Sequence, residues 1–484
     1  MQTPWQPKPG DRFFRPRRIK QFRLRRVLGI PAVFSAGYGN VGSSIYYALG
    51  IVAIVAMGAT PVALGIAGIL FIFTALTYAE GTAMLPEAGG SASFARHGFN
   101  DLCGFIAGWA LMLSYIVTIA ISAFTIPPYL GYFWEPFKDS AAIGTLASVG
   151  IVIFLMTLNV VGIKETSFVN ISAAVLDIAT QVSLVIIGFI LLFNPTLIIS
   201  RIVNNWPAPE NLILGIALAA IAYTGIETMS QMAEETKKPE QNVPRALVMM
   251  IVAVLVIFAG ISLVSLSAMT PQELASDWSR DPVAGIAANL PLAVLQVVLK
   301  PLIAILAGTI LLIATNAGLI GISRLAFSLG KHRLVPPVLS RIHPRFKTPY
   351  ISIILFSIIA ILIIIPGFFE ANVFKNMGAL YAIGSLLAFT FAHASIISLR
   401  IRRPELPRPF KVGWNIKIKG HELPVTAILG ICALSVIWII ILITQPYSRW
   451  VGLGWMVVGI IIYYFYRKRE NLPLTHTPEN PEKQ

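Results

Sequence analysis

Charged residues, cysteine and histidine are all scarce in this chain. Asp, Glu, Lys and Arg together make up 12% of its 484 residues, whereas soluble domains carry about 25%. The two cysteines, Cys103 and Cys432, give neither a disulfide framework nor a metal-binding pattern. The six histidines do not combine with cysteines or carboxylates at metal-ligand spacing, and no Ser-His-Asp arrangement is evident. We therefore predict a protein that has no metal site and no cofactor and is not an enzyme.

Apolar residues dominate instead. They make up 56% of the chain, and the mean hydropathy is +0.76. A helix needs roughly 20 apolar residues to cross a bilayer, and twelve runs meet this condition. These runs are 29–57, 61–86, 101–128, 141–163, 166–194, 211–235, 244–270, 300–329, 350–369, 371–399, 423–444 and 449–467. The sequence predicts an all-α integral membrane protein with twelve transmembrane helices in one membrane-embedded domain.

The net charge of +15 is distributed unevenly between the two sides of this predicted domain. If the N-terminus is cytoplasmic, 31 of the 37 Lys and Arg residues fall on the cytoplasmic side. The six on the other side are Lys138, Arg201, Arg280, Lys300, Lys375 and Arg449. This asymmetry follows the positive-inside rule. It predicts a multi-pass protein of the plasma membrane with both termini in the cytoplasm, and it argues against nucleic acid as the partner of the basic residues.

The two ends of the chain are polar. Residues 1–28 form a basic segment whose main predicted role is to set the topology, with anionic lipid as a second contact. No secretory signal is recognised before the first span, because that span is too long and lacks a small-residue cleavage site. Residues 468–484 are predicted to form a cytoplasmic tail that is disordered from Asn471 onward.

Helix-breaking sequence interrupts two of the predicted spans. Gly37, Gly39 and Gly42 interrupt the first, and Tyr223-Thr224-Gly225 interrupts the span 211–235. A broken helix frees backbone N–H and C=O groups, which persist in a membrane where they line a cavity. Such breaks at matching places in two halves of a chain indicate a transporter's substrate site. The alternative for the first run is a glycine-lined packing face; a dinucleotide site is disfavoured because the run is not between a strand and a helix.

Polar side chains accompany the apolar runs. Asn40, Ser43 and Ser44 lie beside the first interruption. Ser114, Thr118 and Ser122 recur every four residues and so share one helix face. This stripe either lines the pathway or bonds to the carbonyls of its own helix.

Three acidic residues lie well inside spans, where ionisable groups are rare and default to functional hypotheses. Asp177 shares a helix face with Gln181, and it must be protonated, paired or bound to a cation. It serves either ion or proton coupling or an interhelical hydrogen bond. Glu227 follows the second interruption and can accept freed N–H groups, as a structural or a protonated group. Glu80, near the end of its span, is predicted to make a structural or gating contact.

Other polar residues lie at mid-membrane depth. We predict that Thr315 and Asn316 either coordinate a cation or hold neighbouring helices together. His393 is predicted to be a satisfied interhelical donor rather than a ligand.

Several motifs point to a known family. The end of the second span reads Tyr-Ala-Glu-Gly-Thr-Ala-Met-Leu-Pro-Glu-Ala-Gly-Gly-Ser (78–91). The sixth span and its exit read Ala-Tyr-Thr-Gly-Ile-Glu-Thr (222–228), Ala-Glu-Glu-Thr-Lys-Lys-Pro (233–239) and Val-Pro-Arg-Ala (243–246), which is the most specific signal. Gly-Ile-Ser-Arg (321–324) and the Arg-Pro pairs after the tenth span also fit. Over roughly 30–412, the chain resembles amino acid permeases of the amino acid–polyamine–organocation superfamily.

This resemblance implies a five-plus-five inverted repeat with discontinuous helices 1 and 6. The repeats would be 29–194 and 211–399, followed by extra helices within 423–467, all in a transporter domain over 29–467. The α-carboxylate of an amino acid would lie against Gly37 to Gly42, and its α-amino group against Ile221 to Gly225. A bulky residue near Tyr223 would close the pocket. The substrate-binding candidates are Gly37, Gly39, Asn40, Gly42, Ser43, Ser44, Ser114, Thr118, Ile221, Tyr223, Thr224 and Gly225.

The resemblance also frames the coupling question. Many proton-dependent relatives carry a lysine where this chain has Asp177, so Asp177 either carries the coupling proton or helps to bind a cation. The coupling candidates are Asp177, Glu227, Thr315 and Asn316, with H⁺ or Na⁺ as the ion. The predicted function is secondary active transport of an amino acid, small or apolar and neutral, by alternating access, through symport or exchange. Alternatives are potassium uptake, polyamine transport, or a membrane sensor that binds without transport. The sequence does not predict the oligomeric state.

Overall fold

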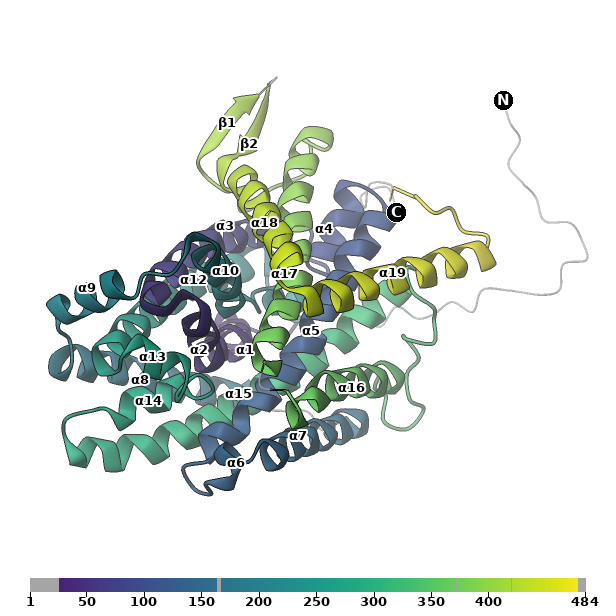
Figure 1. The fold of residues 1–484 in the computed structure, drawn as a ribbon. Coiled ribbons are helices and arrows are strands. Elements are labelled where there is room, and N and C mark those ends of the chain that lie inside the picture. Colours follow the sequence, from purple (N-terminus) through teal and green to yellow (C-terminus); the bar gives the residue numbers. More distant parts are fainter. Residues whose placement is uncertain (1–25, 163–166, 371, 419, 478–484) are drawn as a thin grey trace, which may run out of the picture.

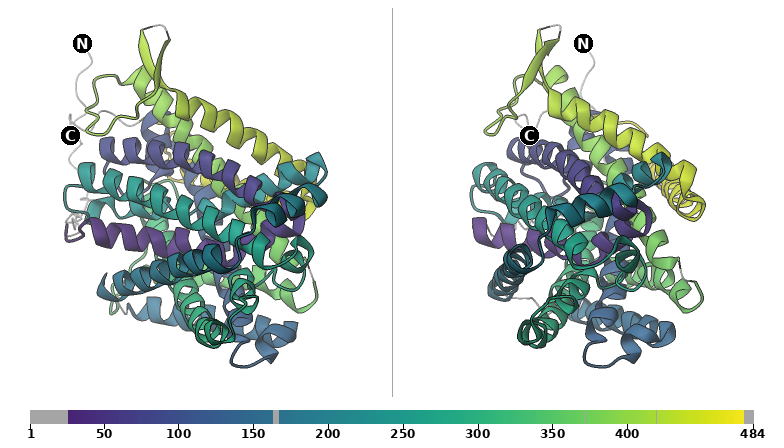
Figure 2. Two further views of the ribbon diagram at one scale, coloured as in Figure 1. Left: turned by 90° about the vertical axis from the view of Figure 1, so that its left-hand side faces the viewer. Right: turned by 60° about the vertical axis from the view of Figure 1, so that its left-hand side comes forward.

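The computed structural model describes residues 26–162, 167–370, 372–418 and 420–477. Its helices form one bundle, and Figures 1 and 2 show this bundle from three directions. The predicted N-terminal segment, up to residue 25, and residues 478–484 of the predicted tail lie outside the described residues.

The first half of the chain is entirely helical in its described part. Its elements are α1 (Ile30–Val41), η1 (Gly42–Ser44), α2 (Ile45–Ala56), η2 (Met57–Ala59), α3 (Thr60–Met84), α4 (Ser91–Gly98), α5 (Asp101–Leu130), α6 (Pro136–Asp139), α7 (Ala141–Val161), α8 (Ser167–Leu191) and α9 (Pro195–Asn204), where η marks a 3₁₀ turn. Local sequence explains many of the helix ends. Asn100 caps α5 by accepting the Cys103 N–H, and Gly162 ends α7 in the left-handed conformation.

The second half adds one small sheet. Its elements are α10 (Pro209–Ala219), η3 (Ala220–Tyr223), α11 (Glu227–Gln231), η4 (Ala233–Glu235), α12 (Pro239–Ala268), α13 (Pro271–Ala275), α14 (Pro282–Ala288), α15 (Ala293–Lys331), α16 (Tyr350–Ile364), η5 (Ile365–Phe368), α17 (Val373–Arg402), β1 (Asn415–Ile418), β2 (His421–Pro424), α18 (Val425–Thr444) and α19 (Pro446–Arg469). β1 and β2 pair antiparallel, with Ile416 opposite Leu423. The prediction of an all-α protein missed this hairpin, which is too short to register in the apolar runs.

Eleven helical stretches of the described residues are long and apolar enough to span a membrane. One of them, Ile30–Met84, covers both of the predicted runs 29–57 and 61–86. A straight helix of its 55 residues would be about 80 Å long, far more than the ~30 Å hydrocarbon core. The chain interrupts this stretch at η2, where Met57 has a φ of 48°.

Burial divides the helices into two groups. α5 and α17 pack in the middle of the bundle, and most of their side chains are buried. In α7, α8, α18 and α19, only about a third or less of the most apolar part of each helix is buried inside the protein. Their exposed side chains are large and apolar, as at Phe154, Ile190 and Val436. A helix that is apolar on its exposed side as well suits a lipid environment.

Ion pairs hold the end of the bundle where α3, α17 and α19 finish, which we call the basic end. Arg400 makes two hydrogen bonds to the Glu80 carboxylate, at 2.7 and 2.5 Å. The Asp101 carboxylate forms ion pairs with Arg96 at 2.9 Å and with Arg467 at 3.0 Å. At the opposite end, Lys138 pairs with Asp281 at 2.8 Å.

The prediction that the chain is disordered from Asn471 is wrong for residues 471–477. This segment folds back over the basic end, where the His476 carbonyl accepts the N–H of Asp101 at 2.8 Å. The Leu474 carbonyl accepts the Tyr463 hydroxyl at 2.7 Å. The physical reason is that the first N–H groups of α5 need acceptors, and the nearby tail carbonyls supply them.

Candidate substrate and coupling sites

The first interruption is a short 3₁₀ turn. α1 ends at Val41, η1 occupies Gly42–Ser44, and α2 continues from Ile45. Gly42 keeps right-handed helical angles, with φ −64° and ψ −33°. The predicted interruption over Gly37 to Gly42 is therefore placed too early, because Gly37 and Gly39 lie inside α1. The reason is that glycine tolerates a helix interior at a modest cost of about 1 kcal/mol.

Close packing explains these glycines. A Cβ atom at Gly37 would lie 2.3 Å from the Met229 side chain of α11, and one at Gly42 would lie 2.4 Å from the Tyr38 ring. The sequence left a glycine-lined packing face as the alternative to a break in this helix. The structure shows such a packing face at Gly37. Ser43 and Ser44 both donate to the Asn40 carbonyl, at 3.0 and 3.2 Å, and so satisfy a backbone group beside the turn.

The second interruption is a true break in the helix. Thr224 is extended, with φ −81° and ψ 157°, and Gly225 has a φ of +112°. α11 then begins at Glu227, whose Oε2 accepts the Gly225 N–H at 3.0 Å. The predicted role of Glu227 as an acceptor of a freed N–H is confirmed. A positive φ of this size favours glycine, because a Cβ atom would clash with the backbone.

The two interruptions meet in space. Asn40, just before η1, donates through Nδ2 to the Thr228 hydroxyl of α11 at 3.0 Å. A Cβ atom added to Gly225 would lie 2.8 Å from Cγ of Asn40. The Asn40 side chain approaches the Gly225 backbone so closely that a Cβ atom does not fit between them unless Asn40 moves. Residues from the two predicted halves of the chain therefore form one site.

Polar groups around this meeting point are buried and incompletely paired. Asn40, Tyr115, Glu227 and Tyr381, which we call the central cluster, are each at most 1% exposed. Asn40 Oδ1 and Glu227 Oε1 have no hydrogen-bond partner among the described residues. The Tyr381 hydroxyl lies beside Thr118 and Thr224, and the Tyr115 hydroxyl lies beside Thr228, without bonds of standard geometry. Buried polar groups are normally paired, so a convergence of unpaired ones indicates a place for a polar ligand or water.

Asp177 of α8 forms a second polar network. Its Oδ1 accepts the Tyr46 hydroxyl at 2.7 Å, and its Oδ2 accepts the Tyr38 hydroxyl at 3.0 Å and Gln181 at 2.5 Å. The predicted pairing of Asp177 and Gln181 on one helix face is confirmed. Tyr38 precedes η1 and Tyr46 follows it, so one carboxylate holds both sides of the first interruption.

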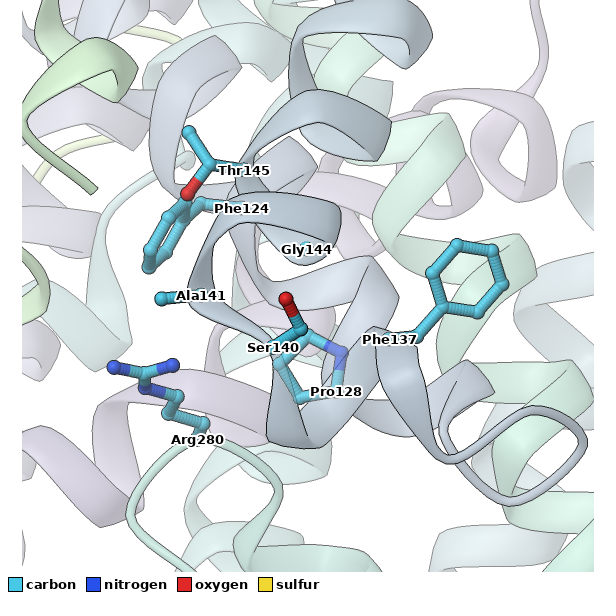
Figure 3. Close-up of a pocket in the computed structure, with 8 residues that line it drawn as sticks. All are labelled: Phe124, Pro128, Phe137, Ser140, Ala141, Gly144, Thr145 and Arg280. Carbon is cyan, nitrogen blue, oxygen red and sulfur yellow. The ribbon is translucent and has the colours of Figure 1, made fainter. Parts of the chain in front are cut away.

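Two cavities lie near Arg280, toward the end of the bundle opposite the basic end. The larger has a volume of about 310 Å³ and is lined by Lys138, Asp281, Lys375 and their neighbours. The smaller, about 10 Å³, is the pocket of Figure 3, where Arg280 points toward Phe124 and the Thr145 hydroxyl. A volume of that size holds about one water molecule. Three of the basic residues predicted for the sparsely charged side thus gather at one end.

Known proteins match this chain over almost its whole length. A sequence profile described as amino acid permease matches residues 28–465. The chain belongs to this family of amino acid permeases. As a permease of this family with many apolar helices, it is a multi-pass membrane transport protein.

Individual relatives of the permease are distant but of similar length. The branched-chain amino acid permease of Bacillus subtilis is 26% identical, covering 93% of this chain and 94% of the relative. The methylthioribose transporter of the same organism is also 26% identical, covering 94% and 96%. Its glutamate/serine transporter is 24% identical, covering 92% and 83%. The names of these relatives therefore span more than one substrate class.

The structure does not bring every predicted residue into the central cluster. Tyr223 points from η3 toward α3, donates to the Leu64 carbonyl at 2.8 Å and stacks on Phe71. The Ile221 carbonyl accepts both the N–H and the hydroxyl of Thr224. Tyr223 therefore faces α3 rather than the cluster, whereas Thr224 shapes the interruption and also lies beside the Tyr381 hydroxyl of the cluster.

One of the two predicted roles of the stripe on α5 is observed, and only for Thr118. Thr118 bonds back to the Ser114 carbonyl at 2.9 Å, whereas the buried hydroxyls of Ser114 and Ser122 have no partner among the described residues. On α15, Thr315 donates to its own helix, and Asn316 accepts Asn159 of α7 at 2.5 Å. The helix-holding alternative is thus observed for Asn316.

The structural contacts expected of Glu80 and His393 are present. Glu80 pairs with Arg400 and accepts the Val412 N–H at 2.8 Å, which fastens α3 to the segment after α17. His393 lies between Thr74 and Thr77, with ring nitrogens 3.2 and 2.8 Å from their hydroxyls. Both side chains hold helices together.

Tyrosines are the residues that the sequence reasoning missed. Tyr38 and Tyr46 bind Asp177, and Tyr115 and Tyr381 belong to the central cluster. The available signal was the position of these tyrosines in the sequence. Tyr115 directly follows Ser114, and Tyr46 lies two residues after the serines of η1. That spacing places each hydroxyl on a helix but does not say which other helix it meets.

Proposed function

We propose that this permease is a secondary active transporter that moves an amino acid across the plasma membrane by alternating access. One observation carries the proposal. The two interrupted helices meet at Asn40 and Gly225, beside buried polar atoms that have no hydrogen-bond partner in the described part of the chain. Interruptions of this kind in a membrane protein line binding sites, and the unpaired atoms supply the contacts for a polar substrate.

The chemistry of the cluster suits a small zwitterion. Glu227 Oε1 and Asn40 Oδ1 are acceptors for an ammonium group. The hydroxyls of Tyr115 and Tyr381 are donors for a carboxylate. No member of the cluster is a lysine or arginine that would hold a second carboxylate. A small or apolar neutral amino acid therefore fits better than a dicarboxylic one, and the three relatives have names that include both kinds.

Twelve spans, the five-plus-five repeat and the cytoplasmic placement of both termini are part of this proposal. The twelfth span follows if Ile30–Met84 turns at Met57, where φ is positive. In that case α1–η1–α2 is span 1 and α3 is span 2. The interruptions in η1 and at Thr224–Gly225 then occupy spans 1 and 6, the first spans of the two repeats.

Asp177 is the proposed coupling group, with H⁺ as the ion. As a carboxylate it accepts three hydrogen bonds, two of them from tyrosines on either side of η1. A proton on Asp177 converts one acceptor into a donor, so at least one of these bonds must rearrange. Protonation thereby changes how tightly α8 holds the first interruption, and links the proton to the substrate site.

The test is uptake of labelled amino acids into proteoliposomes with an inward proton gradient applied or collapsed. We expect the wild-type protein to accumulate a small neutral amino acid only with the gradient. Asp177→Asn should bind that substrate but not concentrate it. Glu370→Gln, which removes an exposed carboxylate before α17, is the matched control and should resemble the wild type.

Two outcomes would contradict the proposal. If Asp177→Asn still concentrates substrate to the wild-type level, Asp177 is not the coupling group. If no amino acid is taken up with proton gradient, sodium gradient or internal substrate, the amino acid itself is the wrong cargo. Potassium or rubidium flux would then identify the alternative.

A further inference from the structure

The hairpin β1–β2 extends the chain sideways from the helix bundle. It lies between the end of α17 at Arg402 and the start of α18 at Val425, at the basic end. Figures 1 and 2 show it projecting away from the helices, on the side of α17 and α18. Because α18 begins directly after β2, the base of the hairpin lies where the chain enters the membrane domain.

One face of the hairpin is apolar and is only partly covered by the described residues. Side chains alternate between the two faces of a strand, so Ile416 and Ile418 share a face that Lys417 does not. Ile416 is 41% exposed and Ile418 is 44% exposed. Trp414, directly before the strand, is 66% exposed. An alternating pattern normally places its apolar face against a core; here Leu423, opposite Ile416, is only 7% exposed, so the described residues cover the base of this face and leave its outer part open.

Contacts at its base fix the hairpin to the bundle. Arg400 donates to the Asn415 side chain at 2.6 Å and to the Glu422 carbonyl at 3.1 Å. Lys411 pairs with the Glu422 carboxylate, and this pair lowers the pKa of Glu422. Arg400 is itself held by Glu80 of α3. The base of the hairpin is therefore held against α17 and α3, and the orientation of its apolar face relative to the bundle is fixed.

The segment that carries this apolar face is rich in positive charge. Between Arg400 and Pro424 the sequence contains seven Lys or Arg residues and two Glu residues. Of these, Arg402, Lys411, Lys417 and Glu405 are exposed. Basic residues next to a membrane helix are attracted to anionic phospholipid headgroups, and tryptophan favours the boundary between headgroups and acyl chains.

We propose that the hairpin is a membrane-interface anchor. Trp414, Ile416 and Ile418 insert at the boundary between headgroups and acyl chains, and Lys417 with its basic neighbours contacts anionic headgroups. The occupant of the apolar face is thus the lipid surface rather than another protein. Charge complementarity, the aromatic and aliphatic side chains, and the position next to α18 all favour that choice.

Spin-label accessibility tests this arrangement in the full-length protein. In a background with Cys103→Ala and Cys432→Ala, a spin label is attached at Ile416→Cys or, as the matched control on the other face, at Lys417→Cys. The proteins are reconstituted in phosphatidylcholine vesicles with and without phosphatidylglycerol. Oxygen, which concentrates in the membrane, and a water-soluble nickel complex are the two relaxing agents.

We expect the label at 416 to be reached several-fold better by oxygen than by nickel, and the label at 417 to show the reverse preference. Phosphatidylglycerol should increase the contrast at 416, and Lys411→Gln combined with Lys417→Gln should remove that increase. If nickel reaches 416 as readily as 417 in both vesicle types, the apolar face lies in water and the anchor is ruled out. If the contrast is present but independent of phosphatidylglycerol and of both lysines, the contact with anionic lipid is ruled out.

Discussion

The two interrupted helices reach the same site by different backbone routes. The first tightens into η1 and keeps right-handed angles at Gly42, with serine hydroxyls bonded back to the Asn40 carbonyl. The second abandons helical geometry at Thr224 and Gly225, where φ is positive and Glu227 accepts a freed N–H. The first helix is thus continuous through a single 3₁₀ turn, whereas the second is broken between α10 and α11.

This difference separates two kinds of dependence on sequence. The gap in the second helix depends on the backbone of one residue, because few side chains allow the φ of Gly225. The turn in the first helix depends on side-chain hydrogen bonds. Tyr38 and Tyr46 donate to the Asp177 carboxylate, and Asn40 donates to the Thr228 hydroxyl. We infer that the second interruption is the fixed half of the site and the first is the half that responds to Asp177.

The largest effect is expected for Gly225→Ala. The new Cβ atom is incompatible with φ +112° and would lie 2.8 Å from Asn40. We expect transport to fall at least about tenfold and the free energy of unfolding to fall by about 1–3 kcal/mol. Uptake assays and thermal melts measure the two effects. Gly454→Ala in α19, where an added Cβ meets nothing within 4 Å, is the control and should leave both unchanged.

A smaller effect is expected for Gly42→Ala. The backbone accepts alanine here, but its Cβ atom would lie 2.4 Å from the Tyr38 ring. The ring must move, and its hydrogen bond to Asp177 is lost, so stability should fall by about 1 kcal/mol and gradient-driven uptake should weaken. Tyr38→Phe should reproduce the loss of coupling. If Tyr38→Phe couples normally, the Tyr38 hydroxyl does not link Asp177 to the turn.

The smallest effect on stability is expected for Tyr381→Phe. This hydroxyl makes no standard hydrogen bond among the described residues, so thermal melts should match the wild type. If it binds substrate, KM should rise about three- to tenfold, in line with the ~1 kcal/mol of one hydrogen bond. Tyr129→Phe is the contrasting variant, because its hydroxyl donates to the Tyr46 carbonyl at 2.8 Å. It should lower the melting temperature without this selective rise in KM.

Several parts of the fold follow from local sequence and were predicted. Apolar runs located the long helices, and the i,i+4 spacing paired Asp177 with Gln181. The second interruption was located correctly because Gly225 is needed for a positive φ. The first was placed too early because Gly37 and Gly39 are conformationally permissive but not obliged to leave the helix.

Contacts between distant residues were not predictable in the same way. Glu80 and Arg400 are 320 residues apart, and Tyr46 and Asp177 are 131 apart. A helical period gives the face on which a side chain lies, but not the helix that packs against this face. The ordered conformation of residues 471–477 was not predicted for the same reason. It depends on backbone carbonyls of this segment that accept hydrogen bonds from the first N–H of α5 and from Arg467.

The sequence by itself determined that the chain is an apolar helical protein, which two spans carry breaks, and where three of its buried carboxylates lie. Hydropathy, charge asymmetry and glycine placement are properties of short segments, so they can be read without coordinates. Only the tertiary structure decided that Asn40 meets Gly225, that Asp177 holds both sides of η1, and that the described residues cover the apolar face of β1 only in part. Those facts arise from helix packing, which joins side chains that the sequence keeps far apart.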